Sequence, residues 1–169
     1  MSLNVNPSNQ SNPSPSPSNT DPSSQTPDKN SGGANLRKAV EYLVIRRLAG
    51  NNEELEALRL AIVEGMSPSE VSKKLGVPRA SVKTAVYAFE KIVGDHRKAT
   101  EVLKTFLPAV MKIQPVMKVY YGKEYVCVLC GLKGVAYVNI RKAKLMHIKQ
   151  AHKDLIDKYV DEVMAGVRA

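Results

Sequence analysis

Apolar residues recur every three or four positions along most of the chain after residue 35, which is the spacing of helices that bury one face. This period, with the caps and breaks between its segments, predicts helices over residues 36–48, 53–64, 68–75, 79–93, 95–107 and 154–169. Between 119 and 126 the pattern instead predicts two short strands that turn at Gly122-Lys123. The expected fold class is therefore mainly α with a small β element.

The clearest boundary signals lie between residues 67 and 79. Ser67 provides a hydroxyl N-cap, Pro68 occupies the first helical position, and Glu70 stands three residues after the cap, as in a capping box. Gly76 follows this helix at a position where a left-handed residue can end it, and a second helix is expected to begin at Arg79. The pattern thus predicts two short helices joined by a tight turn.

The second of these helices has two distinct faces. One face is apolar and is expected to pack, and it carries Val82, Ala85, Val86, Phe89 and Val93. The opposite face is left for a partner, and it carries Ala80, Lys83, Thr84, Tyr87 and Lys91. The arrangement resembles the helix-turn-helix of bacterial and archaeal DNA-binding proteins, in the residues Glu70-Val71, Leu75-Gly76-Val77, Ser81-Val82 and Ala85-Val86. A helical hairpin in an unrelated bundle is the alternative.

The resemblance implies that residues 79–93 are a recognition helix that enters the groove of duplex DNA. The side chains implied to reach phosphates and base edges are Arg79, Ser81, Lys83, Thr84 and Tyr87, and those implied to lie over the backbone are Ser69, Lys73 and Lys74. Because most operators are read by two-fold dimers, a homodimer is considered alongside a monomer.

Two cysteines and two histidines near the C-terminal end form a candidate metal site. Cys127 and Cys130 are followed, after sixteen intervening residues, by His147 and then by His152. Two thiolates and two neutral imidazoles complete a tetrahedral zinc shell and leave no open position for water or substrate, so the zinc would be structural. The alternative is a pair of reduced thiols with a helical histidine and an exposed one.

The segment around this site resembles the two-Cys, two-His zinc finger, in which a β-hairpin carries the cysteines and a helix supplies the histidines. Its sixteen-residue central spacing exceeds the roughly twelve usual in such fingers, and Lys144 stands where an apolar residue is expected before His147. A regular helix places His147 and His152 roughly 140° apart, so the helix must tighten or break between them. In a DNA-reading finger the start of the helix would present Arg141 and Lys142 to the groove or to phosphates, whereas a solvated basic face is the alternative.

Composition divides the chain into an N-terminal tail and a basic body. Residues 1–35 are rich in Ser, Pro, Asn, Gln and Gly and are expected to be disordered, since they hold too little apolar surface to offset the entropy of ordering. They hold one lysine and two aspartates, a net charge of −1, so the remainder carries 24 basic and 14 acidic residues, a net charge of +10 that favours an anionic polymer as partner. The expected segments after the tail are a helix-turn-helix domain over 36–94, a connecting helix over 95–117, a zinc finger over 118–153 and an amphipathic helix over 154–169.

Other function classes find little support in the sequence. There is no glycine-rich phosphate loop, no pair of carboxylates in an apolar context and no evident small-molecule substrate site, so we interpret the chain as a non-enzyme. No apolar stretch is long enough to span a bilayer and no signal peptide is evident, which predicts a cytoplasmic, nucleoid-associated protein without a membrane partner.

The leading hypothesis is a regulator of transcription that binds double-stranded DNA, similar to small regulators of archaeal cells, viruses and plasmids. The alternatives are an architectural or partition-type DNA binder and an RNA-binding or protein-interaction module.

Overall fold

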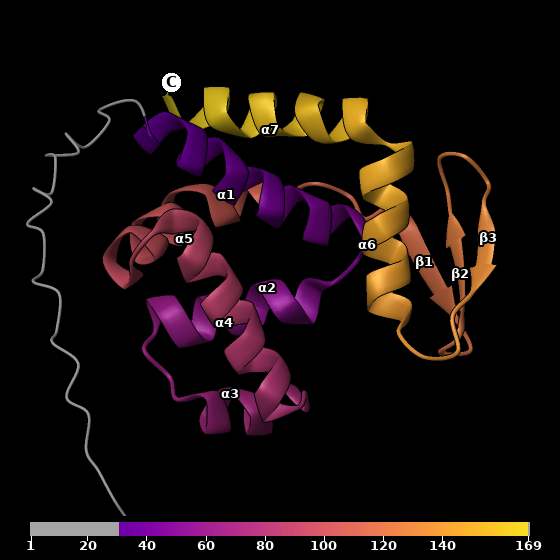
Figure 1. The fold of residues 1–169 in the computed structure, drawn as a ribbon, viewed down its shortest axis with the longest axis horizontal. Helices are drawn as coiled ribbons and strands as arrows, with labels where there is room; N and C mark the ends of the chain where they lie inside the picture. Colours follow the sequence, from indigo (N-terminus) through magenta and orange to yellow (C-terminus); the bar gives the residue numbers. More distant parts are fainter. Residues whose placement is uncertain (1–30, 169) are drawn as a thin grey trace, which may run out of the picture.

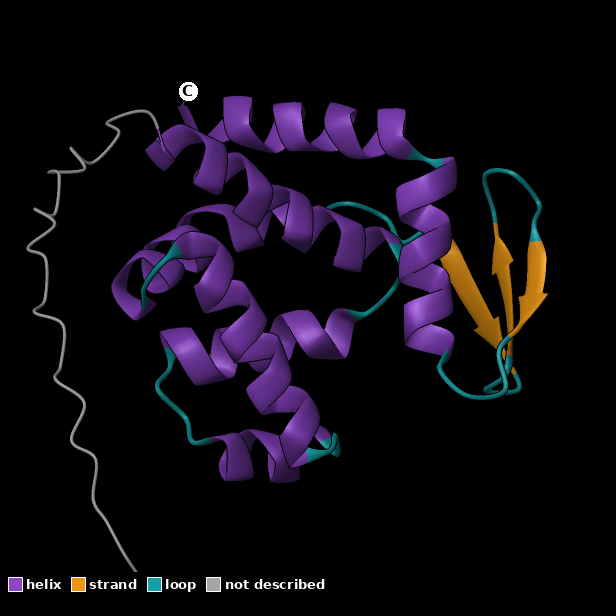
Figure 2. Cartoon of the chain, viewed as in Figure 1, coloured by secondary structure: helices purple, strands orange, loops and turns teal. Residues whose placement is uncertain are grey.

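The computed structural model describes residues 31–168, which fold into a helical body with one small sheet (Figure 1, Figure 2). The mainly α fold class expected from the sequence is confirmed. The elements, in chain order, are α1 (Ser31–Leu48), α2 (Asn52–Leu58), a π-helical turn η1 (Arg59–Val63), α3 (Pro68–Leu75), α4 (Arg79–Val93), α5 (His96–Val110), β1 (Met117–Tyr120), β2 (Glu124–Cys127), β3 (Lys133–Val135), α6 (Ile140–Ala151) and α7 (Lys153–Arg168).

The start of α1 corrects the boundary of the expected N-terminal tail. Residues 31–35 are helical, whereas residues 1–30 of that tail lie outside the described part of the chain. Two adjacent glycines at 32 and 33 have poor helix propensity, which is why the sequence pattern places the boundary later. Once a helix has nucleated, each further residue adds a hydrogen bond, so α1 continues through them.

Helix α1 forms the centre of the core. Its fully buried side chains include Val40, Leu43, Val44 and Leu48. The helix contacts α2, α4, α5, α6 and α7, and α7 runs along it at the top of Figure 1. Ile156, Val160 and Val163 of α7 are buried in the same cluster. The amphipathic C-terminal helix therefore packs onto the body.

The expected helix over 53–64 is interrupted by the π-helical turn η1, in which Glu64 N–H donates to Arg59 C=O five residues earlier. A single π-helical turn changes the direction in which the following side chains point. It is too short to alter the spacing of apolar residues along the sequence, so that spacing does not predict it. Leu58, just before the turn, joins the main core, whereas Leu60, within the turn, joins a smaller core with residues of α3 and α4.

The sheet is an antiparallel meander in the order β1-β2-β3. The two expected strands are present, and Tyr121 and Gly122 make their turn in the left-handed region, with φ of 50° and 72°. Strand β3 was not expected, because it has three residues with a glycine at the centre. Tyr125 covers that glycine so closely that a Cβ on Gly134 would lie 2.3 Å from the tyrosine ring.

Helix α6 joins the sheet to the helical body, and Figure 2 shows it standing between them. Cys127 of β2 and Ile148 of α6 belong to the same buried cluster as the side chains of α1, α4 and α5. Val116 N–H donates to Leu48 C=O at 2.9 Å, which ties the entry to β1 onto the end of α1. The segment that resembles a zinc finger thus shares the core of the helical body. Within residues 31–168, no helix combines the length and apolar character needed to cross a membrane.

Candidate metal centre and nucleic-acid interface

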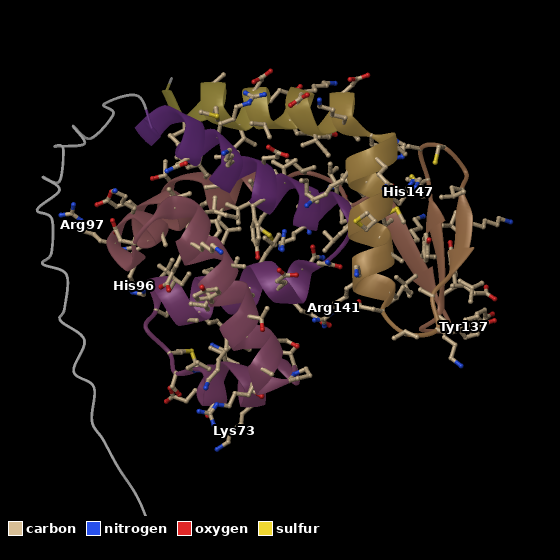
Figure 3. All side chains as sticks on the ribbon, viewed as in Figure 1. Lys73, His96, Arg97, Tyr137, Arg141 and His147 are labelled. Atoms are coloured by element: carbon tan, nitrogen blue, oxygen red, sulfur yellow. The ribbon has the colours of Figure 1, made fainter. Side chains whose placement is uncertain are left out.

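Three elements bring the candidate metal ligands together. Cys127 ends β2, Cys130 lies in the tight turn after it, and His147 lies in the third turn of α6, on the side that faces the sheet in Figure 3. The turn is closed by Gly131 N–H, which donates to Cys127 C=O at 2.9 Å, and Gly131 has a φ of 72°. Glycine adopts this left-handed conformation without steric cost, so the chain can return immediately toward β3.

His152 supplies the fourth ligand from the break between α6 and α7. It is the C-cap of α6, with φ −132° and ψ 40°, and α7 begins at the next residue. The prediction that the helix must tighten or break between His147 and His152 is confirmed. The break directs both imidazoles to one point: their Nε2 atoms lie 3.2 Å apart and their ring centroids 5.0 Å apart.

The distances between the ligand atoms fit a tetrahedral ion. All four atoms lie within 4.8 Å of one another, Cys127 Sγ is 3.2 Å from His152 Nε2, and Cys130 Sγ is 3.5 Å from His147 Nε2. Tetrahedral bonds of about 2.3 Å to sulfur and about 2.0 Å to nitrogen would separate sulfur from nitrogen by about 3.5 Å and two nitrogens by about 3.3 Å. The four side chains therefore could hold a metal ion with little rearrangement.

Burial and charge at the site favour the ligating form of His147. Cys127 is fully buried, the two histidines are half-buried, and Cys130 is exposed. Burial, followed by the neighbouring His152 imidazole, lowers the pKa of His147, so its neutral form is favoured. A neutral imidazole is the form that binds a metal. An ion held by all four side chains would have no open tetrahedral position for water or substrate.

The segment from α3 through the turn to α4 has the local geometry that its sequence predicts. Ser67 Oγ accepts from Glu70 N–H at 3.3 Å while Glu70 Oε2 accepts from Ser67 N–H at 2.8 Å, which completes the capping box. Gly76 is left-handed, with φ 67° and ψ 24°. Ser72 Oγ donates to Val77 C=O at 2.6 Å and fixes the turn that follows. The small core of Ala57, Leu60, Val71, Val77 and Val82 holds α2, α3 and α4 together.

The outward face of α4 is exposed along its first half. Arg79, Lys83, Thr84 and Tyr87 are exposed and Ser81 is half-buried, whereas Val82, Ala85, Phe89 and Val93 are buried on the opposite face. On α3, Lys73 and Lys74 are exposed and Ser69 is half-buried. Within residues 31–168, none of these four cations makes an ion pair. The Thr84 hydroxyl donates to Ala80 C=O at 2.9 Å, which leaves only its lone pairs for a partner.

The two basic residues at the start of α6 have different surroundings. Arg141 forms an ion pair with Glu53 of α2 at 2.9 Å, and Figure 3 shows it directed toward the helical body. Lys142 is exposed, and its backbone N–H donates to the N-cap Asn139. Arg141 lines a cleft of about 310 Å³ with Ser81 and Thr84, so the N-terminal turns of α4 and α6 flank one hollow.

Sequence reasoning missed a polar group on the inner side of this cleft. The Tyr42 hydroxyl donates to Glu54 at 3.1 Å, Glu54 also pairs with Arg46, and the Arg46 guanidinium lies 3.2 Å from the centroid of the Tyr42 ring. Burial raises the pKa of Tyr42. Tyr42 and Arg46 are four residues apart on α1, so helical spacing alone could have predicted their contact. The contact of both with Glu54 of α2 could not be predicted from local sequence, because it depends on how α2 packs against α1.

No protein-family model matches this chain, and comparison with curated proteins and with solved structures finds no match either. The assignment of function therefore depends on the site geometry alone.

Proposed function

We propose that this protein is a regulator of transcription that binds double-stranded DNA through the helix α4. The observation that carries the proposal is the pairing of the capped helix α3 with α4 across a left-handed Gly76, with Arg79 and Lys83 exposed on the outward face. Such a helix can enter the major groove, where arginine and lysine bond guanine edges or phosphates. The net charge of +9 supports association with an anionic polymer.

Zinc is the metal we propose for the four-ligand site, because two cysteines and two histidines at tetrahedral distances match its preferred shell. Its role is to fix α6 against the sheet. Since Cys127 and Ile148 also belong to the main core, a bound ion would stabilise the seam between the sheet and the helical body. The basic start of α6 would then lie at a constant position beside the first turn of α4.

A second candidate function, single-stranded RNA binding, is favoured by two exposed tyrosines in the loops next to the sheet. Tyr121 is 95% exposed and Tyr137 is 81% exposed, although large aromatic side chains at a hairpin ordinarily pack. Exposed aromatic rings can stack on unpaired bases. Lys123, which lies 6.0 Å from the Tyr137 ring, adds a cation beside them.

The experiment that decides between these functions is a selection of binding sites from random duplex DNA with zinc-loaded protein at near-physiological salt, repeated after chelation. A compact or palindromic motif supports sequence-specific regulation, and its loss on chelation shows that the metal centre contributes. Binding to duplex without an enriched motif favours an architectural binder, while preference for single strands favours the RNA candidate.

Single substitutions test the interface directly. We expect Lys83→Ala to weaken binding to the selected duplex and to lower the slope of log affinity against log salt by about one, the effect of losing one phosphate contact. Lys104→Ala, which removes the same charge from an exposed position on α5, is the matched control and should leave affinity nearly unchanged. Equal effects of the two substitutions would place Lys83 outside the interface.

A further inference from the structure

Lys144 occupies an unusual position for a charged side chain. It stands on α6 where a zinc finger carries an apolar residue, and only 5% of its surface is exposed. A buried lysine is costly unless its ammonium group is paired or hydrogen-bonded. Within residues 31–168 the ammonium group of Lys144 has neither an ion-pair partner nor a hydrogen-bond acceptor.

A second buried donor lies beside it. Asn51, between α1 and α2, is 6% exposed, and its side-chain Nδ2 is buried without any hydrogen-bond partner. Asn51 and Lys144 line the same cavity of about 520 Å³, at the seam between the helical body and α6. Buried polar groups are normally satisfied, so the unpaired Nδ2 of Asn51 indicates a missing acceptor, and the cation of Lys144 lines the same cavity.

The other groups around this cavity also favour an acceptor that is an anion. Ile140 and Arg141, the first two residues of α6, line it, and the first N–H groups of a helix carry partial positive charge. The two carboxylates that line the cavity already have partners, since Glu53 pairs with Arg141 and Glu54 pairs with Arg46. Within residues 31–168, Lys144 is therefore attracted by Glu53 but has no carboxylate paired with it directly.

We propose that this cavity binds a phosphate group. A tetrahedral oxyanion can accept at the same time from an ammonium group, an amide and the N-terminus of a helix, and residues that carry all three line this one cavity. The phosphate belongs either to a small phosphorylated molecule or to the backbone of DNA, because the neighbouring cleft shares Glu53, Glu54 and Arg141 and continues to the first turn of α4. The site itself does not depend on the proposed DNA binding.

The first test is a titration of zinc-loaded, ¹⁵N-labelled protein with inorganic phosphate at constant ionic strength, followed by NMR. The side-chain amide signals of Asn51 should shift in a saturable manner. Lys144→Met keeps the buried stem and removes the charge, so it should weaken phosphate binding by about tenfold to a hundredfold, the loss expected for one charge-assisted hydrogen bond. Lys149→Met, at an exposed position of the same helix, is the matched control and should bind phosphate as the parent does.

The second test separates the two sources of phosphate. If Lys144→Met, but not Lys149→Met, lowers the salt slope of duplex binding by about one, the site takes a backbone phosphate. If Lys144→Met abolishes binding of inorganic phosphate and leaves the duplex salt slope unchanged, the site takes a free phosphorylated molecule. The proposal is overturned if phosphate leaves the Asn51 amide signals in place and Lys144→Met changes neither measurement. It is equally overturned if Lys149→Met weakens phosphate binding as much as Lys144→Met.

Discussion

Replacing Gly76 with alanine isolates the backbone cost of the turn between α3 and α4. Gly76 has φ 67° and ψ 24°, and a Cβ built on it meets no heavy atom within 4 Å. The cost is therefore purely conformational, and a left-handed alanine is disfavoured by about 1–2 kcal/mol. Alanine also loses less entropy than glycine when the chain folds, which offsets part of this cost. We expect a net destabilisation of about 1 kcal/mol and a fall in melting temperature of about 2–4 °C.

The matched control is Gly166→Ala in α7, where a Cβ also meets no heavy atom within 4 Å but φ is not in the left-handed region. This variant should be unchanged or more stable by up to about 1 kcal/mol, since alanine is the better helix former. Gly76→Asn should fall between the parent and Gly76→Ala, because asparagine tolerates the left-handed region better. Urea denaturation followed by circular dichroism measures all three. If Gly76→Ala is as stable as Gly166→Ala, the assigned geometry of the turn is wrong.

Three further predictions concern the core and the metal centre. Phe89→Ala should cost about 3–5 kcal/mol in denaturant titrations, because the ring is fully buried against Tyr42 and α1, and a loss under 1 kcal/mol would contradict the packing. Arg37→Ala should cost less than about 1 kcal/mol in the same assay, because its ion pairs with Asp157 and Asp161 are exposed. In metal-free protein, the lowered pKa of His147 should make stability fall as pH drops below about 6.5, where the unfolded imidazole takes up a proton first, and level off below the folded pKa; a rise in stability over that range would refute the sign.

The parts of the fold that depend on local signals could be predicted from the sequence. Ser67 and Glu70 cap the same helix in any tertiary setting, and Gly76 ends it because few other residues adopt a left-handed conformation. The ligands Cys127 and Cys130 could be found in the same way, since a short spacing fixes their mutual distance whatever surrounds them.

The remaining features depend on contacts between distant residues. Arg141 was expected to face a nucleic acid, and its partner Glu53 lies 88 residues away in sequence. Lys144 is likewise buried beside Asn51 only because α6 packs against the helical body. The periodicity of apolar residues within α6 does not predict that packing. The only local sign of this burial is a lysine at a position where an apolar residue is expected. Strand β3 and the π-helical turn were missed because each is too short to set up a repeating pattern.

If the four side chains hold a metal ion, the sharing of Cys127 between this centre and the main core would make the stability of the whole fold a function of free metal concentration. A ligand that binds only the folded chain stabilises it by RT ln(1 + [L]/Kd). Each tenfold rise in free metal above the dissociation constant therefore adds about 1.4 kcal/mol to the free energy of unfolding. Because the centre has no separate core of its own, this gain extends to α1 and to the helices packed on it. Metal supply would then set how much folded protein exists, independently of any contact between the metal centre and a partner.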